Sequence, residues 1–282
     1  MAGLPLADAG PLLDRLAPAL LFSDVDGTLV GRAGSLLADL DGRPTLAAAQ
    51  ALVAAHRAGL EVVLISGRTA EQLRETGRLL GTRDAIGELG TVLVRGREAE
   101  LIWGAAPRDL GACPAEALER SGALAAVLEG FAGRLEPHTP WHLGRRGTFL
   151  LRGQVDPAEA DALLADRGAG WARLLDNGRL RGAYPHLGSG PAHAYHLLPA
   201  GVSKAGTAAT YLADRGLQPA QAAAIGDSPA DLQLARVVGA MFLVANGAWA
   251  ADTTPDTPLI ITPSAAGQGW SEAVGALLER MT

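Results

Sequence analysis

The 282-residue sequence contains a single cysteine, Cys113. One thiol excludes an intrachain disulfide and a zinc cluster built on thiolates, and it fits a reducing compartment. Basic residues are fewer than acidic ones, 24 against 30, which gives a formal charge of -6. Nucleic acids and anionic membranes bind basic surfaces, so we expect neither as a partner. An anionic ligand must then be held by a local site.

The sequence also lacks a long uninterrupted apolar run. The most apolar window, residues 47–65, is broken by Gln50, His56, Arg57 and Glu61, which are costly to place in hydrocarbon. The N-terminal residues carry acids where a secretory signal has its basic region, and prolines interrupt every apolar stretch there. We therefore expect a cytoplasmic protein without a membrane span, and the sequence leaves a monomer and a homodimer equally open.

Short strand patterns alternate with longer helix patterns in the first part of the chain. Residues 19–23 and 60–65 have the pattern of buried strands, whereas residues 45–58 and 69–80 have helix-forming composition. Such alternation is typical of strand-helix-strand units and predicts a mainly parallel sheet. Hydrophobic residues make up 48% of the sequence, which is ample for a core in one large domain or two ordinary ones.

The middle of the chain departs from this alternation. Residues 91–94 and 98–103 resemble paired strands, residues 114–131 resemble a helix, and residues 171–181 resemble a hairpin that turns at Asn177-Gly178. A second α/β domain, inserted into the first, is therefore predicted.

The first pattern resumes with a predicted strand at residues 195–198 and continues to the end of the chain. We therefore predict an α/β fold, a Rossmann-like doubly wound parallel sheet with an inserted α/β cap domain. Residues 1–94 and 192–282 would form the discontinuous core, and residues 95–191 would form the cap.

Two carboxylates follow the first predicted strand directly. In the segment Phe22-Ser23-Asp24-Val25-Asp26-Gly27-Thr28, the i, i+2 spacing of the acids points both side chains to one side of extended backbone. The carboxyl ends of parallel strands are where open α/β sheets bind ligands. Two carboxylates there would repel each other and an incoming phosphate unless a divalent cation neutralised them, so the motif favours a magnesium site. Taken alone, it could also be a turn.

Two further segments could bind an anion. Ser66-Gly67-Arg68 ends the second strand with a hydroxyl and backbone N–H groups that can bind phosphate oxygens at a helix start, although a serine N-cap explains the pattern equally well. Lys204 begins a predicted helix, where a cation opposes the helix dipole and a nearby anion would explain its place. A solvated surface lysine is the alternative.

A last pair of acids, Asp227 and Asp231, follows another predicted strand in the segment Gly226-Asp227-Ser228-Pro229-Ala230-Asp231. An N-cap with an acid in the first helical turn would also account for it. The four segments nevertheless occur in a fixed order, each at a strand end or a helix start. Together they resemble the four motifs of the haloacid dehalogenase superfamily. The insertion between the serine and lysine motifs resembles the branch that contains sucrose-phosphate and mannosyl-3-phosphoglycerate phosphatases.

This resemblance implies a magnesium-dependent phosphatase acting on a small phosphorylated metabolite, a sugar phosphate or glycosyl-phosphoglycerate. Asp24 would be the covalent nucleophile and Asp26 the general acid and base. Mg²⁺ would be held by the Asp24 carboxylate, the Asp26 carbonyl and Asp227, while Asp231 would orient Lys204 or a metal-bound water. The implied phosphate-binding residues are Thr28, Ser66, Gly67 and Lys204.

One departure from the resemblance is Ala230, where many relatives have asparagine, so one polar contact near the metal is missing from the pattern. Substrate choice is expected in the cap, and the candidate substrate-binding residues are Arg68, Arg146 and His186. The alternatives are a phosphomutase on the same scaffold, a phosphoglycolate-type phosphatase and a non-enzymatic phosphometabolite-binding module. The binding module is disfavoured because both Asp24 and Asp26 are present.

Overall fold

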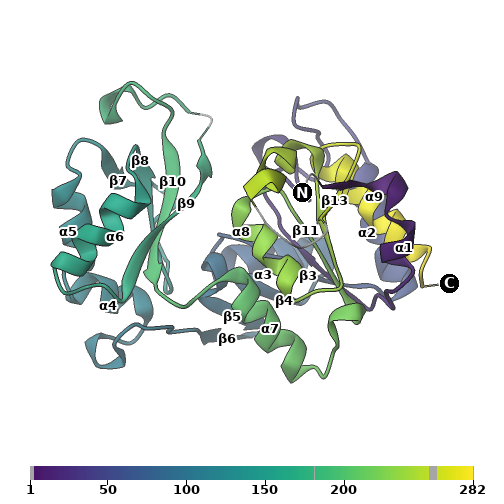
Figure 1. Ribbon diagram of the computed structural model, residues 1–282, viewed down its shortest axis with the longest axis horizontal. Coiled ribbons are helices and arrows are strands. Elements are labelled where there is room, and N and C mark those ends of the chain that lie inside the picture. Colours follow the sequence, from purple (N-terminus) through teal and green to yellow (C-terminus); the bar gives the residue numbers. More distant parts are fainter. Residues whose placement is uncertain (1–2, 181, 254–258, 282) are drawn as a thin grey trace. The chain divides into compact units, whose positions relative to one another are not determined.

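The computed structural model describes residues 3–180, 182–253 and 259–281. The chain divides into two compact units. Unit 1 comprises Met1–Gly90, Val94–Arg97 and Lys204–Thr282, and unit 2 comprises Thr91–Leu93 and Glu98–Ser203. Figure 1 shows the ribbon coloured along the sequence, with purple and yellow segments, from the two ends of the chain, side by side in unit 1.

Unit 1 is built on a parallel sheet whose strands come from both parts of the chain. Its strand order runs β1 (Leu4–Pro5), β13 (Leu259–Ile261), β12 (Ala240–Leu243), β11 (Ala222–Gly226), β2 (Leu20–Ser23), β3 (Glu61–Ile65) and β4 (Asp84–Gly87), with every neighbouring pair parallel. The order continues through β5 (Val92–Arg95) and β6 (Glu98–Leu101), where the chain passes between the units. The predicted fold class is confirmed.

The central strand β2 explains why the sheet must be covered on both faces. All four of its residues are buried, and Phe22 lies beside Ala224 on one side and Val63 on the other. A strand without an exposed alternate residue is typical of parallel sheets between two helical layers. Figure 1 shows α2 (Ala47–Ala58) with α9 (Ala266–Leu278) at one face and α7 (Lys204–Asp214) with α8 (Pro229–Leu232) at the other.

The remaining helices of unit 1 are α1 (Gly10–Leu13) and α3 (Ala70–Leu80). Helix α3 begins at a capping box in which the Thr69 side chain accepts from the Gln72 backbone and the Gln72 side chain accepts from Thr69. Short 3₁₀ helices occur in both units, at Leu6–Asp8, Arg32–Gly34, Glu88–Gly90, Arg108–Leu110, Pro185–Leu187, Pro219–Gln221, Gln233–Arg236 and Ala245–Thr253. No helix in the described part of the chain is long and apolar enough to cross a membrane.

Unit 2 contains an antiparallel sheet with its own apolar core. The strand order is β7 (Leu135–Pro137), β8 (Phe149–Gly153), β10 (His193–Pro199) and β9 (Ala172–Arg179). Helices α4 (Pro114–Arg120), α5 (Ala123–Gly130) and α6 (Pro157–Asp166) contribute Leu118, Val127 and Leu164 to this core. The unit therefore buries its own hydrophobic residues.

Three local expectations are wrong. The strand predicted at residues 195–198 belongs to β10, which pairs with β8 and β9 in unit 2 instead of extending the parallel sheet. The predicted hairpin is also absent from the described residues, because β9 continues past Asn177-Gly178 and pairs with β10 on both sides of a register shift, where Gly178 has a φ of +100°. The helix expected at residues 114–131 is divided into α4 and α5 at Gly122, whose left-handed φ of +80° interrupts helical backbone.

Candidate active site

Asp24 is the first residue after β2, and its backbone is fixed from two sides. Its N–H donates to the Ile225 carbonyl at 2.9 Å, which ties it to β11. Its carbonyl accepts a 2.8 Å hydrogen bond from the Ser23 hydroxyl, and Ser23 Oγ in turn accepts one of 2.9 Å from the indole of Trp270 on α9. Trp270 is completely buried. The last long helix of the chain therefore helps to hold the backbone of Asp24.

Lys204, at the start of α7, is buried between two acids. Its Nζ donates to Asp24 Oδ1 at 2.9 Å and to Asp231 Oδ1 at 2.6 Å, and both carboxylates are buried as well. Burial would lower the pKa of Lys204, but the Asp231 and Asp24 carboxylates outweigh it and raise that pKa above its ordinary value. Lys204 is therefore a fixed ammonium ion, and the alternative of a solvated surface lysine is excluded.

Asp231 uses both of its oxygens within this network. Oδ1 accepts from Lys204, while Oδ2 accepts from the Ser228 hydroxyl at 2.6 Å, the Ser228 N–H at 3.1 Å and the Asp227 N–H at 3.2 Å. The segment after β11 is thus a capping box at the start of α8 as well as part of the acidic cluster. With its oxygens occupied, Asp231 is suited to orient Lys204.

Asp227 and Asp24 are the acids with capacity for a cation. One carboxylate oxygen each from Asp24, Asp227 and Asp231 lie within 4.8 Å of one another. Burial and the neighbouring Asp231 raise the pKa of Asp227 to about 7, and burial raises the pKa of Asp24 well above its ordinary range despite the opposing Lys204. Carboxylates that resist ionisation because they are crowded and buried fit a divalent cation, and Mg²⁺ prefers such oxygen ligands.

The serine segment also lies at the end of its strand as expected. Ser66 is buried just after β3, its N–H donates to the Ile86 carbonyl at 2.9 Å, and its Oγ accepts the Arg68 N–H at 3.3 Å. Thr28 differs, because it is completely buried and its hydroxyl has no hydrogen-bond partner among the described residues. The Thr28 hydroxyl therefore has no role among the described contacts, and its assignment as a phosphate-binding residue stays a prediction.

Arg68 forms a two-pronged ion pair with Asp26. Its Nη2 lies 2.6 Å from Asp26 Oδ1, and its Nε lies 2.8 Å from Asp26 Oδ2. The Arg68 side chain is 25% exposed and that of Asp26 is 56% exposed. The structure therefore joins a candidate substrate-binding residue directly to the candidate general acid.

Comparisons with known proteins identify the family. No family model matches the chain. A phosphoglycolate phosphatase of Methanoculleus marisnigri is 30% identical over 259 residues, which is 90% of this chain and 94% of the relative. The chain belongs to the haloacid dehalogenase superfamily of phosphatases.

Solved structures of other members share the fold of this superfamily phosphatase. The sucrose-phosphatase of Synechocystis, solved with sucrose and phosphate, matches with a TM-score of 0.63 and 18% identity, covering 93% of this chain and 98% of that chain. A superfamily phosphatase of Bacteroides thetaiotaomicron matches with a TM-score of 0.62 and 16% identity, covering 94% and 96%. The resemblance inferred from the four motifs is thereby confirmed.

Asn246 is a residue of the site that the four motifs did not predict. Its Nδ2 donates to the Gly27 carbonyl at 3.0 Å and to Asp227 Oδ2 at 3.1 Å, and its Oδ1 accepts the Ala266 N–H at 2.9 Å. Ala230 leaves no amide in the fourth motif, but Asn246 brings one to Asp227 from the segment after β12. The only signal in the sequence is compositional, because Asn246 is one of two asparagines in the chain.

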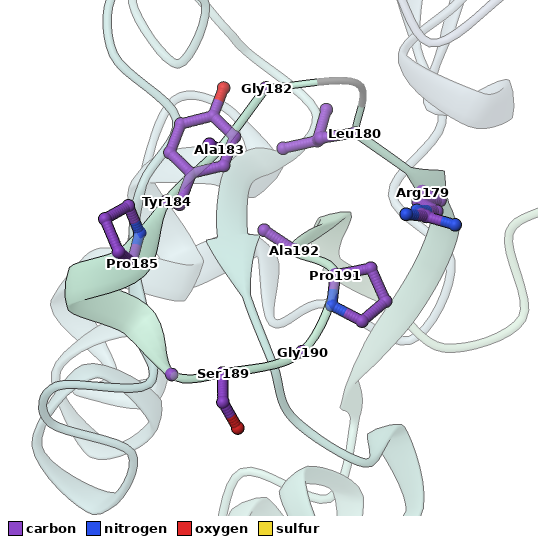
Figure 2. Close-up of a pocket in the computed structure, with 11 residues that line it drawn as sticks. Arg179, Leu180, Gly182, Ala183, Tyr184, Pro185, Ser189, Gly190, Pro191 and Ala192 are labelled. Carbon is purple, nitrogen blue, oxygen red and sulfur yellow. The ribbon is translucent and has the colours of Figure 1, made fainter.

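The other two candidates of the superfamily pattern, Arg146 and His186, belong to unit 2. The Arg146 carbonyl accepts the Ala115 N–H at 2.9 Å, and His186 Nε2 lies 3.1 Å from Glu136 Oε1. Unit 2 also contains a cavity of about 940 Å³ lined by residues of the segment 179–192 (Figure 2). Figure 2 shows the Ser189 side chain pointing away from it. None of its described lining residues is an acid, so this cavity lacks a carboxylate nucleophile.

Proposed function

We propose that the protein is a magnesium-dependent phosphatase that hydrolyses 2-phosphoglycolate through an aspartyl-phosphate on Asp24. The observation that carries the chemistry is the buried contact of Lys204 with Asp24, beside Asp227. The substrate is proposed from the Methanoculleus relative, which is named a phosphoglycolate phosphatase. That name favours the phosphoglycolate alternative over the sugar phosphate expected from the sequence.

The residues fit a bound Mg²⁺, because Asp24 and Asp227 offer carboxylate oxygens and Asp231 is already saturated. We infer that these two carboxylates and the Asp26 carbonyl hold the ion. Bound there, Mg²⁺ supplies positive charge that offsets the phosphate charge and keeps the crowded acids ionised.

In the proposed first step, an Asp24 oxygen attacks phosphorus in line with the ester oxygen. The new bond to Asp24 forms as the phosphorus–ester bond breaks, and the electron pair leaves with the glycolate oxygen, which takes a proton from Asp26. Asp26 then removes a proton from water, which attacks phosphorus and releases Asp24 together with inorganic phosphate. The enzyme returns to its starting protonation state.

Charge stabilisation is assigned to groups already fixed by the fold. We propose that Lys204, the Ser66 hydroxyl and the Gly67 backbone contact the equatorial phosphate oxygens as charge spreads over them. Lys204 is held by Asp231 and requires no reorganisation, which is the condition for effective electrostatic catalysis. Cytoplasmic location and the choice between monomer and homodimer remain predictions from the sequence.

A phosphate-release screen tests the proposal. Purified protein would be given 2-phosphoglycolate, sucrose 6-phosphate, mannosyl-3-phosphoglycerate and an aryl phosphate, with and without Mg²⁺, and Asp24→Asn protein would serve as the blank. We expect Mg²⁺-dependent release with the highest kcat/KM for 2-phosphoglycolate. Full activity in excess chelator, or a clear preference for a sugar phosphate, would overturn it. Product analysis separates the mutase alternative, which yields an isomer and little free phosphate.

A further inference from the structure

Arg68 presents its flat guanidinium to a carboxylate in a geometry that a substrate could reproduce. Both oxygens of Asp26 are bound, by Nε at 2.8 Å and by Nη2 at 2.6 Å. A guanidinium binds a carboxylate in this paired way because its N–H groups form a rigid planar fork. Any other carboxylate that reached the same fork would be recognised equally well.

The Arg68 guanidinium is held in place by the protein, whereas the Asp26 carboxylate that it binds faces solvent. Arg68 Nη1 donates to Thr76 Oγ1 at 3.1 Å, and this hydroxyl donates to the Gln72 carbonyl at 2.8 Å, so helix α3 holds the guanidinium. The Asp26 side chain is 56% exposed, against 25% for Arg68. An incoming anion can therefore compete for Arg68 without entering a closed core.

The proposed reaction requires Asp26 to give up this pairing. A carboxyl group that protonates a leaving oxygen must itself carry a proton, whereas in the pair with Arg68 both Asp26 oxygens accept hydrogen bonds from a cation, which favours the ionised form. Asp26 must also lie beside the leaving oxygen of the ester. In 2-phosphoglycolate a carboxylate is attached one carbon from that oxygen, so it would arrive close to both Asp26 and Arg68.

We propose that Arg68 determines specificity by exchanging the Asp26 carboxylate for the carboxylate of the substrate. The exchange recognises the acid and releases the Asp26 carboxylate, whose side chain is 56% exposed and can take a proton from solvent before giving it to the leaving oxygen. A phosphate ester without the carboxylate would leave Arg68 paired with Asp26. This inference rests on the proposed function, since it names the residue that would select a phosphorylated hydroxy acid.

The test compares two substrates that differ in this one group, 2-phosphoglycolate and 2-hydroxyethyl phosphate. Arg68→Gln should lower kcat/KM for 2-phosphoglycolate by about 100-fold, the scale expected when one partner of a desolvated charge pair is removed. Activity on 2-hydroxyethyl phosphate should not fall and should rise within about fivefold, because the substitution frees Asp26 from a pairing that this ester cannot displace. Arg68→Lys should recover only part of the preference, since an ammonium lacks the paired geometry.

Binding without turnover supplies a second measurement. In an Asp24→Asn background, calorimetry with Mg²⁺ present should show Arg68→Gln weakening 2-phosphoglycolate binding and leaving 2-hydroxyethyl phosphate binding unchanged. Arg78→Gln is the matched control, because Arg78 is another arginine paired with an acid, lying on helix α3 and bound to Glu75 at the surface. It should alter neither substrate.

The outcomes separate the two claims. If the wild-type enzyme does not prefer 2-phosphoglycolate to 2-hydroxyethyl phosphate, the proposed function itself fails. If it does prefer 2-phosphoglycolate and Arg68→Gln lowers both activities equally in a folded protein, the proposed function stands and the exchange is overturned. Arg68 would then only position Asp26.

Discussion

Lys204 Nζ lies 2.6 Å from Asp231 Oδ1, closer than its 2.9 Å distance from the Asp24 carboxylate. The acid outside the proposed chemistry therefore holds the cation more closely than the nucleophile does. Asp231 is itself fixed by two N–H groups and a hydroxyl. Lys204 is thus held beside Asp24 by a partner that takes no part in the proposed reaction.

Replacing Asp231 with alanine should destabilise the protein markedly. The change leaves the buried Lys204 with one partner and removes the acceptor of the Ser228 hydroxyl. Breaking a buried ion pair by removing one partner costs about 3–5 kcal/mol, which urea unfolding would measure. Glu71→Ala, at an exposed ion pair with Arg74, is the control and should cost less than about 1 kcal/mol. Similar losses in the two variants would contradict the argument.

Magnesium affinity should rise with pH and level off above about 7. Burial and Asp231 raise the pKa of Asp227 to about 7 in the metal-free protein, and Mg²⁺ must compete with this proton. The folded protein keeps a proton that the unfolded chain loses near pH 4. Without metal, the free energy of unfolding should therefore fall as the pH rises from about 4, where the unfolded chain loses this proton, to about 7, where the folded protein loses it.

Calorimetric titration with Mg²⁺ between about pH 5 and 8 would measure this affinity, and urea unfolding in chelator would measure the stability. Asp227→Asn should weaken binding and flatten both pH dependences. A Mg²⁺ affinity in the unchanged protein that is constant across this range would contradict the prediction.

Asp26→Asn should slow hydrolysis of an alkyl phosphate by roughly 10²- to 10⁴-fold, the usual loss when a general acid or base is removed. Asparagine cannot donate a proton to the leaving alkoxide, whereas an aryl leaving group hardly needs one. Steady-state kinetics on both esters would show a smaller loss for the aryl phosphate. Equal losses would assign Asp26 a different role.

Asn246→Ala should weaken Mg²⁺ binding by about 10- to 100-fold, the range observed when an outer partner of a metal ligand is removed. The substitution deletes the amide that binds Asp227 Oδ2 and the Gly27 carbonyl. Calorimetry would measure the Mg²⁺ affinity directly. Asn177→Ala, at the other asparagine of the chain, on β9, is the matched control. An unchanged affinity in Asn246→Ala would remove Asn246 from the description of the site.

The acids and the lysine of the site could be predicted from the sequence because local rules place them. Asp24 follows a completely buried strand, Asp227 follows another, and Lys204 starts a helix. Parallel strands bring such positions to one edge of a sheet, whatever the distance between them along the chain. The order of strands and helices along the sequence was therefore enough to predict that these three residues lie close together.

Contacts that depend on side-chain direction or on the choice of pairing partner could not be predicted in this way. The apolar pattern of residues 195–198 indicates a strand but does not indicate which sheet contains it. In the structure this strand is part of β10, which pairs with β8 and β9 in the antiparallel sheet of unit 2. The turn signal at Asn177-Gly178 coincides with a register shift in the ladder between β9 and β10, not with a reversal of the chain. The Arg68–Asp26 pair depends on a long side chain folding back, which no spacing rule encodes.

The buried cation of the site is also the only side-chain amine in the protein. Growth on nitrogen-15 lysine would therefore give a single labelled ammonium signal, and that signal would come from the centre of the cluster. Its chemical shift would report Mg²⁺, phosphate and substrate arriving one after another, with no assignment step. Reagents that acylate lysine meet one side-chain target, which the fold protects. The rate of that modification would measure how often the site opens.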